Sequence, residues 1–294
     1  MNENLFTTLS SHINELSKGH RKIAEFILSH YDKAAFMTAS RLGNCVGVSE
    51  STVVRFASEL GYDGYPEFQR VLQEEMRTRL TAVQRIEVSA DRFGHDEVFR
   101  SVLLHDIDRI RCTLEETSPV TFGSAVSYII NASRIYIMGI RSSASLASFL
   151  GYYFKLMLPN VTVIETGSRS ELYEQLMHMS KDDVIIGISF PRYSKQTVHA
   201  LTYAQNVGAK SIAITDQIDS PISQKATIAL LAKSDMVSFV DSLVAPLSLI
   251  NALIVAVSIK NKEIVSRNFE MLDRIWEEYE VYEKNESGNE SAKV

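Results

Sequence analysis

The sequence predicts an all-α amino-terminal domain containing a helix-turn-helix, followed by a three-layer α/β domain with a mostly parallel five-stranded sheet. A helix–turn–helix pattern lies in residues 38–60, and five short β-branched runs, most of them separated by helix-length segments, follow residue 133. The 294-residue length has a prior of about two domains, and 45% hydrophobic residues are ample for their cores. The expected boundaries are 1–80 for the helical domain, 81–95 for a linker, 96–282 for the α/β domain and 283–294 for a polar, disordered tail.

Residues 38–60 predict two helices joined by a tight turn, the first over 38–45 and the second over 49–60. Ser49 suits the N-cap of the second helix, because its hydroxyl can accept from the unpaired backbone N–H groups of the first turn. Gly47 can supply the left-handed backbone of the turn, which would cost any other residue more. This pattern is typical of a DNA-binding helix-turn-helix.

The second helix of this motif has a buried face and an outward face. Its apolar residues recur three and four positions apart, namely Val53, Phe56, Ala57 and Leu60. The opposite face, near the start of the helix, is the part that enters the major groove in this motif. The expected DNA contacts are Ser49, Ser51, Thr52, Arg55, Arg41 and Lys18. Solvated helix surface is the plain alternative for each, and Tyr62 and Tyr65 are expected to pack the domain.

The charge is unusual for a DNA-binding protein. The chain has a formal net charge of −6, and residues 1–80 contain nine Lys or Arg against ten Asp or Glu. Neutralising phosphates supplies much of the affinity for DNA, so a monomer should bind weakly. We therefore expect dimers that span two half-sites about 34 Å apart or a multiple of that.

The second half predicts a doubly wound sheet. Near-continuous apolar runs are typical of parallel strands buried on both faces; they cover 134–139, 161–164, 184–189, 211–215 and 227–231. The predicted helices between them cover 143–158, 168–179 and 194–206. Ligands of such sheets bind beyond the carboxyl ends of the strands, where the connections reverse direction.

Two loops at that edge are rich in hydroxyl groups, 139–144 after the first strand and 189–195 after the third. Each opens a helix, so backbone N–H groups and the positive end of the helix dipole point into one crevice. Hydroxyls and two guanidinium groups there make a phosphate cradle plausible, although a serine before a helix is more often only a cap. The candidate ligand contacts are Gly139, Arg141, Ser142, Ser143, Ser189, Arg192, Tyr193 and Ser194.

Other features limit the protein class. Cys45 and Cys112 match no metal or redox spacing, so we expect a reduced cytoplasmic compartment, no metal and no cofactor. The amino terminus lacks the basic region and apolar run of a signal peptide. Residues 242–259 form an 18-residue stretch without charge, but Pro246 and Asn251 favour a buried or subunit-interface helix over a membrane span.

The chain resembles the RpiR-type bacterial transcription regulators over essentially residues 5–260. The stretches most similar to that family are Val48-Ser49-Glu50-Ser51-Thr52-Val53-Val54-Arg55-Phe56 and Leu60-Gly61-Tyr62-Asp63-Gly64-Tyr65-Pro66-Glu67-Phe68. Ser142 and Ser143 match serines that bind the phosphate of a phosphosugar in sugar isomerase (SIS) domains, and Ser189 and Ser194 match the second SIS loop. The resemblance implies a SIS-like domain of flavodoxin-like strand order, control of sugar-catabolism genes at a double-stranded DNA operator, a phosphosugar effector, and homodimers or homotetramers.

The sequence departs from the broad SIS pattern in both loops. Arg141 stands where a glycine is usual, and Pro191-Arg192 replace a usual Ser-Gly. Both changes add bulk and positive charge to the crevice. Either the ligand carries extra negative charge, such as a carboxylate or a second phosphate, or the arginines themselves partly fill the pocket.

Two other functions compete with a regulator. SIS domains also occur in aldose–ketose isomerases, which need a base to move a proton between adjacent carbons. The acid–base candidates by residue type are Glu165, Glu171, His178 and His199, and no motif ties them to the crevice. The other rival is an architectural DNA-binding protein whose α/β domain only oligomerises. Attachment to a helix-turn-helix favours sensing, so we expect a regulator without catalytic residues.

Overall fold

The computed structural model describes residues 5–79, 81, 83–87, 98–235 and 240–281. The chain divides into two compact units: Met1–Asp108 with Asp235–Ser242, and Arg109–Ser234 with Leu243–Val294. Of the expected linker and tail, residues 82, 88–95 and 283–294 lie outside the described part. Residues 83–87 are helical.

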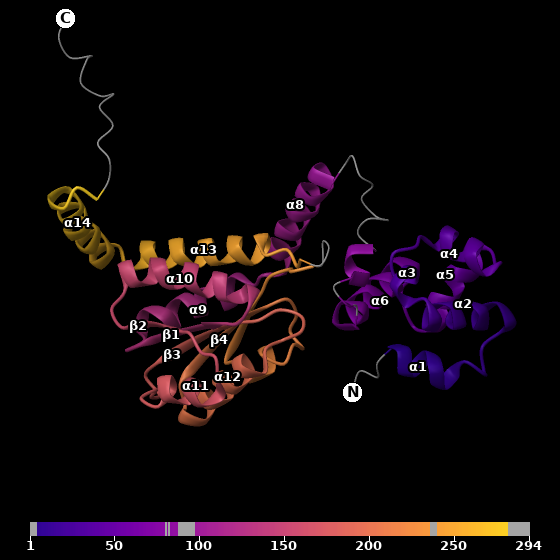
Figure 1. The fold of residues 1–294 in the computed structure, drawn as a ribbon, viewed down its shortest axis with the longest axis horizontal. Coiled ribbons are helices and arrows are strands. Elements are labelled where there is room, and N and C mark those ends of the chain that lie inside the picture. The colour runs from indigo at the N-terminus through magenta and orange to yellow at the C-terminus, as the bar shows by residue number, and fades with distance from the viewer. Residues whose placement is uncertain (1–4, 80, 82, 88–97, 236–239, 282–294) are drawn as a thin grey trace, which may run out of the picture. The chain divides into compact units, whose positions relative to one another are not determined.

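The first unit is built from helices (Figure 1). They are α1 (Leu5–His12), α2 (Lys18–Ser29), α3 (Tyr31–Ala34), α4 (Ala39–Val46), α5 (Glu50–Glu59) and α6 (Tyr65–Arg79), and α8 (Val98–Glu116) runs across the division between the units. The core of the first unit includes the fully buried Ile23, Leu42, Phe56 and Phe68. The Phe56 and Phe68 rings meet edge to face with centroids 5.7 Å apart, so α5 and α6 share one aromatic contact.

Tyr62 and Tyr65 pack this core, as expected. The Tyr65 hydroxyl donates to the Met37 carbonyl oxygen at 2.7 Å, and burial raises the pKa of Tyr65 to about 12. The half-buried Tyr62 ring lies 5.4 Å from the Phe68 ring. Both side chains therefore contribute to the packing of α6 in the first unit.

The second unit contains one parallel sheet of five strands. They are β1 (Ile135–Gly139), β2 (Val161–Ile164), β3 (Val184–Ile188), β4 (Lys210–Thr215) and β5 (Ile228–Leu231). Their order is β2-β1-β3-β4-β5, with Gly139 opposite Ile188 in the β1–β3 pair. The strands match the five predicted runs to within one residue, which confirms the predicted class and the flavodoxin-like order.

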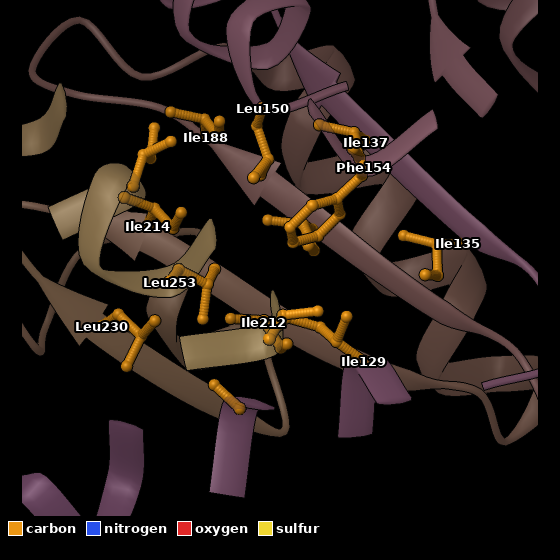
Figure 2. Packing of buried hydrophobic residues seen from close by; sticks show 14 of the residues in the cluster. Ile129, Ile135, Ile137, Leu150, Phe154, Ile188, Ile212, Ile214, Leu230 and Leu253 are labelled. Atoms are coloured by element: carbon orange, nitrogen blue, oxygen red, sulfur yellow. The ribbon is translucent and has the colours of Figure 1, made fainter. Parts of the chain in front are cut away.

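Helices cover both faces of this sheet (Figure 1). One face packs against α9 (Pro119–Asn131), α10 (Ser142–Met157) and α13 (Val244–Lys260), and the other against α11 (Arg169–Leu176) and α12 (Lys195–Val207). Figure 2 shows Phe154 of α10 lying over the strands near Ile137 and Leu150, and all three side chains are fully buried. The sequence analysis predicted no helix at α14 (Lys262–Glu278), on which Val265 is buried.

The uncharged stretch 242–259 forms most of α13, whose Leu249, Ile250 and Leu253 are buried in the sheet-facing core. Among the described residues, no single helix meets the length and hydropathy needed to cross a membrane. Helices α13 and α14 meet those criteria only when taken together, and they are bent by 98° with respect to each other.

Replacing Phe154 with alanine should destabilise the second unit by about 3–5 kcal/mol, because a fully buried ring leaves a cavity that closes only in part. The measurement is urea unfolding followed by circular dichroism. The exposed Lys155→Ala on the same helix is the control and should stay within about 0.5 kcal/mol of wild type. A loss below about 1 kcal/mol for Phe154→Ala would contradict its place in the core.

Candidate functional site

The helix-turn-helix is fixed by two N-caps and one left-handed glycine. The Thr38 hydroxyl accepts from the Arg41 backbone N–H at 3.2 Å, and the Ser49 hydroxyl accepts from the Thr52 N–H at 3.3 Å. Gly47 adopts φ 72° and ψ 43° between the helices. At Gly43 an added Cβ would lie 2.8 Å from the Val48 carbonyl oxygen, so the turn packs directly on the backbone of α4.

The expected DNA contacts on α5 form one cluster at its amino end. The Ser49 Oγ lies 2.9 Å from the Ser51 Oγ and 2.8 Å from the Thr52 Oγ1. Arg55 is exposed one turn further on, and its Nε donates to the Ser51 carbonyl oxygen at 3.3 Å. The hydroxyls and this guanidinium therefore lie on the outward face, opposite the buried Val53, as predicted.

Lys18 and Arg41 come from the two neighbouring helices, and both are exposed. An added Cβ at Gly19 would lie 3.4 Å from the Thr52 Cγ2, so the start of α2 passes beside the first turn of α5. This brings the backbone at Lys18 near the first turn of α5, and no direct contact of the described Lys18 or Arg41 side chains with the hydroxyl cluster is seen. Sequence reasoning missed His20, whose Nδ1 lies 2.8 Å from the Glu59 Oε2 and ties α2 to the far end of α5.

In the second unit, the loop after β1 turns sharply into α10. An added Cβ at Gly139 would lie 2.2 Å from the Ser143 carbonyl oxygen, so only glycine fits there. Arg141, at the N-cap of α10, adopts φ 57° and ψ −124°, a conformation that favours glycine. Ser142 is exposed and Ser143 is buried. Both serines belong to the first turn of α10.

The loop after β3 is held by its own serines. The buried Ser189 Oγ accepts from the Ser194 backbone N–H at 3.0 Å, and the Ser194 hydroxyl caps α12 by accepting from the Thr197 N–H at 3.3 Å. Each hydroxyl keeps a proton that it can donate to a ligand. The wholly buried Thr197 hydroxyl, three residues into α12, has no hydrogen-bond partner in the part of the chain that the structure describes.

A polar network that sequence reasoning missed lies beside this loop. The Tyr193 hydroxyl donates to the buried Asp216 carboxylate at 2.8 Å, and the Gln217 side chain donates to the Tyr193 oxygen at 3.2 Å. Thr215 and Ser220 extend the network, with their hydroxyl oxygens 3.1 Å apart. The Tyr193 hydroxyl is therefore committed to Asp216 in this structure. The Thr-Asp that ends β4, a polar pair after an apolar run, is the sequence signal for this network.

The two serine loops follow adjacent strands whose helices lie on opposite faces of the sheet, α10 on one and α12 on the other. The point between β1 and β3 is therefore the topological switch point of the sheet. The amino ends of both helices open at this edge, where unpaired backbone N–H groups and helix dipoles favour an anion. The arrangement can bind a phosphate group.

The four acid–base candidates lie outside the 139–144 and 189–195 loops. Glu171 accepts from the Gly167 N–H at 2.9 Å and from the Thr166 hydroxyl at 3.2 Å, and these bonds lower the pKa of its carboxyl. The His199 Nε2 lies 3.2 Å from the Arg169 guanidinium. Glu165 and His178 are both exposed. The described residues contain no cluster of three His, Cys, Asp or Glu that could hold a metal ion.

Comparisons with known proteins match both units. Residues 3–79 match the family described as the helix-turn-helix domain of the rpiR family, and residues 128–256 match the SIS domain. HexR of Pseudomonas aeruginosa, an HTH-type transcriptional regulator, is 27% identical over 231 residues, which are 78% of this chain and 78% of that protein. An uncharacterized HTH-type transcriptional regulator of Haemophilus influenzae is 27% identical over 232 residues, 78% of this chain and 79% of that protein.

Solved structures of similar proteins agree with these family matches. The sugar isomerase domain of an RpiR transcription factor from Sphaerobacter thermophilus is 30% identical, with a TM-score of 0.57 over 59% of this chain and 97% of that one. The Vibrio vulnificus NanR protein complexed with ManNAc-6P has the same fold at 21% identity, with a TM-score of 0.56 over 92% and 99% of the two chains. The curated relatives are named as transcriptional regulators, in agreement with the expectation of a regulator. The chain belongs to the RpiR family of helix-turn-helix transcriptional regulators and contains a SIS domain.

Proposed function

We propose that the chain controls sugar-metabolism genes and that a phosphosugar, bound between the 139–144 and 189–195 loops, changes its affinity for the operator. The observation that carries this proposal is the meeting of two helix amino ends, each with serine hydroxyls, at the β1–β3 switch point. The complex of the NanR protein with ManNAc-6P, which shares the fold, supports a phosphosugar as the ligand class.

The DNA-binding surface comprises the hydroxyl cluster of α5, Arg55, Lys18 and Arg41, within the expected domain 1–80. Two or four copies assemble through the expected 96–282 domain. Binding of two copies at once compensates for the weak DNA binding of a single copy, which has few cations. The place of action is the cytoplasm, where a bacterial operator lies. In the coupling mechanism, the ligand alters the packing of subunits at α13 and thereby the separation of paired α5 helices, a change worth ~1–3 kcal/mol.

Arg55→Ala should reduce specific operator binding by about tenfold or more, because one contact to phosphate or to a guanine edge is worth ~1–3 kcal/mol. Fluorescence anisotropy on DNA from upstream of the gene, against scrambled DNA at two salt concentrations, measures this. Arg267→Ala is a matched control. Arg267 is also exposed, and its Nε also donates to a carbonyl four residues earlier at 3.3 Å. Equal losses in both variants would remove Arg55 from the interface.

Ser142→Ala and Ser189→Ala should each weaken phosphosugar binding by ~1–3 kcal/mol, the cost of losing a hydrogen bond to a charged group. DNA binding without ligand should be unchanged. Calorimetry with a panel of phosphosugars measures the effect, and Ser127→Ala on α9 is the control. Ser142 is exposed, so its loss should not disturb the fold. Unchanged affinity in both variants would exclude these serines from the site.

A saturating phosphosugar should change operator affinity by about fivefold to 150-fold in wild type. At a phosphosugar concentration that does not saturate the site, the change in operator affinity should be smaller for Ser142→Ala than for wild type. Anisotropy titrations of DNA with and without ligand, combined with sedimentation to follow the oligomeric state, test the coupling. If every phosphosugar that binds leaves operator affinity and oligomeric state unchanged, the proposed coupling is wrong. That result would favour an architectural DNA-binding protein whose α/β domain only oligomerises.

A further inference from the structure

Two arginines occupy left-handed backbone conformations at the same edge of the sheet. Arg141 has φ 57° in the loop after β1, and Arg192 has φ 63° in the loop after β3. Glycine adopts these conformations without strain, so an arginine at either position is retained against a backbone penalty. The two loops follow paired strands, with Gly139 opposite Ile188, so both arginines lie in loops at the same carboxyl edge of the sheet.

Both guanidinium groups are available to a ligand. Each side chain is exposed, so neither is packed into the crevice as filling. In the described parts of the chain, neither guanidinium makes an ion pair or a hydrogen bond. The buried Asp216 carboxylate, which follows β4, accepts from Tyr193 and Thr215. Lys195, the exposed first residue of α12, adds a further positive charge.

This charge exceeds what one phosphate needs. The amino ends of α10 and α12, with the serine hydroxyls, already supply donors for a phosphate. Two further guanidinium groups in the loops at this edge add positive charge that a second anionic group can neutralise. Guanidinium groups bind carboxylates and phosphates with paired, charge-assisted hydrogen bonds, so their natural partner here is a second anionic group.

We propose that the effector is a doubly anionic phosphosugar, a sugar-acid phosphate or a sugar bisphosphate, whose second anion is bound by Arg141 and Arg192. This inference rests on the proposed phosphosugar site and specifies its ligand class. The arginines are specificity-determining residues, and the serine loops hold the first phosphate. Ligands with one phosphate and no other charge bind more weakly because they leave the arginines without an anion.

Two ligand pairs that differ only in the second anion test the inference on the full chain. They are sorbitol 6-phosphate against 6-phosphogluconate, both open-chain, and fructose 6-phosphate against fructose 1,6-bisphosphate. In calorimetry, we expect the doubly anionic member of at least one pair to bind about tenfold to hundredfold more tightly. Binding of the members with one anionic group with equal or higher affinity in both pairs overturns the inference but leaves the proposed function standing. Binding of none contradicts both.

Arg141→Gly and Arg192→Gly provide the second arm. Each glycine fits the observed backbone, so the variants should fold with an unchanged or higher Tm. Each should lose about tenfold in affinity for the ligand with two anionic groups and less than threefold for its partner with one phosphate. Arg192→Lys keeps the charge but not the paired hydrogen bonds, so its loss should be intermediate.

Asn160→Gly is the backbone control, because Asn160 also has φ 57° but precedes β2 at the opposite edge of the sheet. This variant should keep wild-type affinity for both members of each pair. An equal loss for both members in the arginine variants would show a general electrostatic effect and would overturn the assignment of the second anion to these two residues.

Discussion

The adjacency of β1 and β3 is the constraint on which the proposed effector site depends. Crossovers between parallel strands of one sheet are right-handed, so the chain leaves β1 toward β2 over one face and leaves β3 toward β4 over the other. Helices α10 and α12 therefore diverge to opposite faces, and their amino ends remain together at the carboxyl edge. If another strand lay between β1 and β3, the two serine loops would be separated.

The close packing at this edge explains which residues stand in the first loop. Gly139 is required because the backbone of Ser143 passes where a Cβ would lie. Two residues later the backbone turns into a left-handed conformation, yet the residue is Arg141. Positions of this kind cost of order 1–3 kcal/mol and persist where the surroundings enforce them, often at functional sites. A strained arginine beside a required glycine therefore indicates selection for the side chain itself.

Much of this architecture was predictable because its causes are local. Strands buried on both faces must be apolar throughout, so the central strands β1, β3 and β4 appear directly as β-branched runs. Ser49 and Gly47 mark the helix-turn-helix because capping and left-handed turns restrict residue type at single positions. These signals need no knowledge of long-range contacts.

The features that were not predicted depend on contacts between residues distant in the sequence, or on backbone conformations that the residue type does not indicate. Tyr193 meets Asp216 only because β3 and β4 are neighbours, so the Thr-Asp after the apolar run of β4 indicates a polar site but not its partner in the other loop. An arginine does not indicate a positive φ, so the geometry of Arg141 and Arg192 was invisible. Helix α14 is different, because Val265, Phe269, Leu272 and Trp276 recur at helical spacing and its pattern could have been predicted from the sequence.

The charge of the first unit links DNA binding to assembly. Glu50 lies in the first turn of α5, where a carboxylate stabilises the helix but repels phosphate, and Lys18 and Arg55 are the nearby cations. A single copy therefore gains little from neutralising phosphates, and in the proposed assembly most of the affinity comes from two copies bound at once. Under that condition the effective concentration of the second copy depends steeply on the separation of the α5 helices. A small change in subunit packing, worth ~1–3 kcal/mol, is then enough to switch an operator on or off.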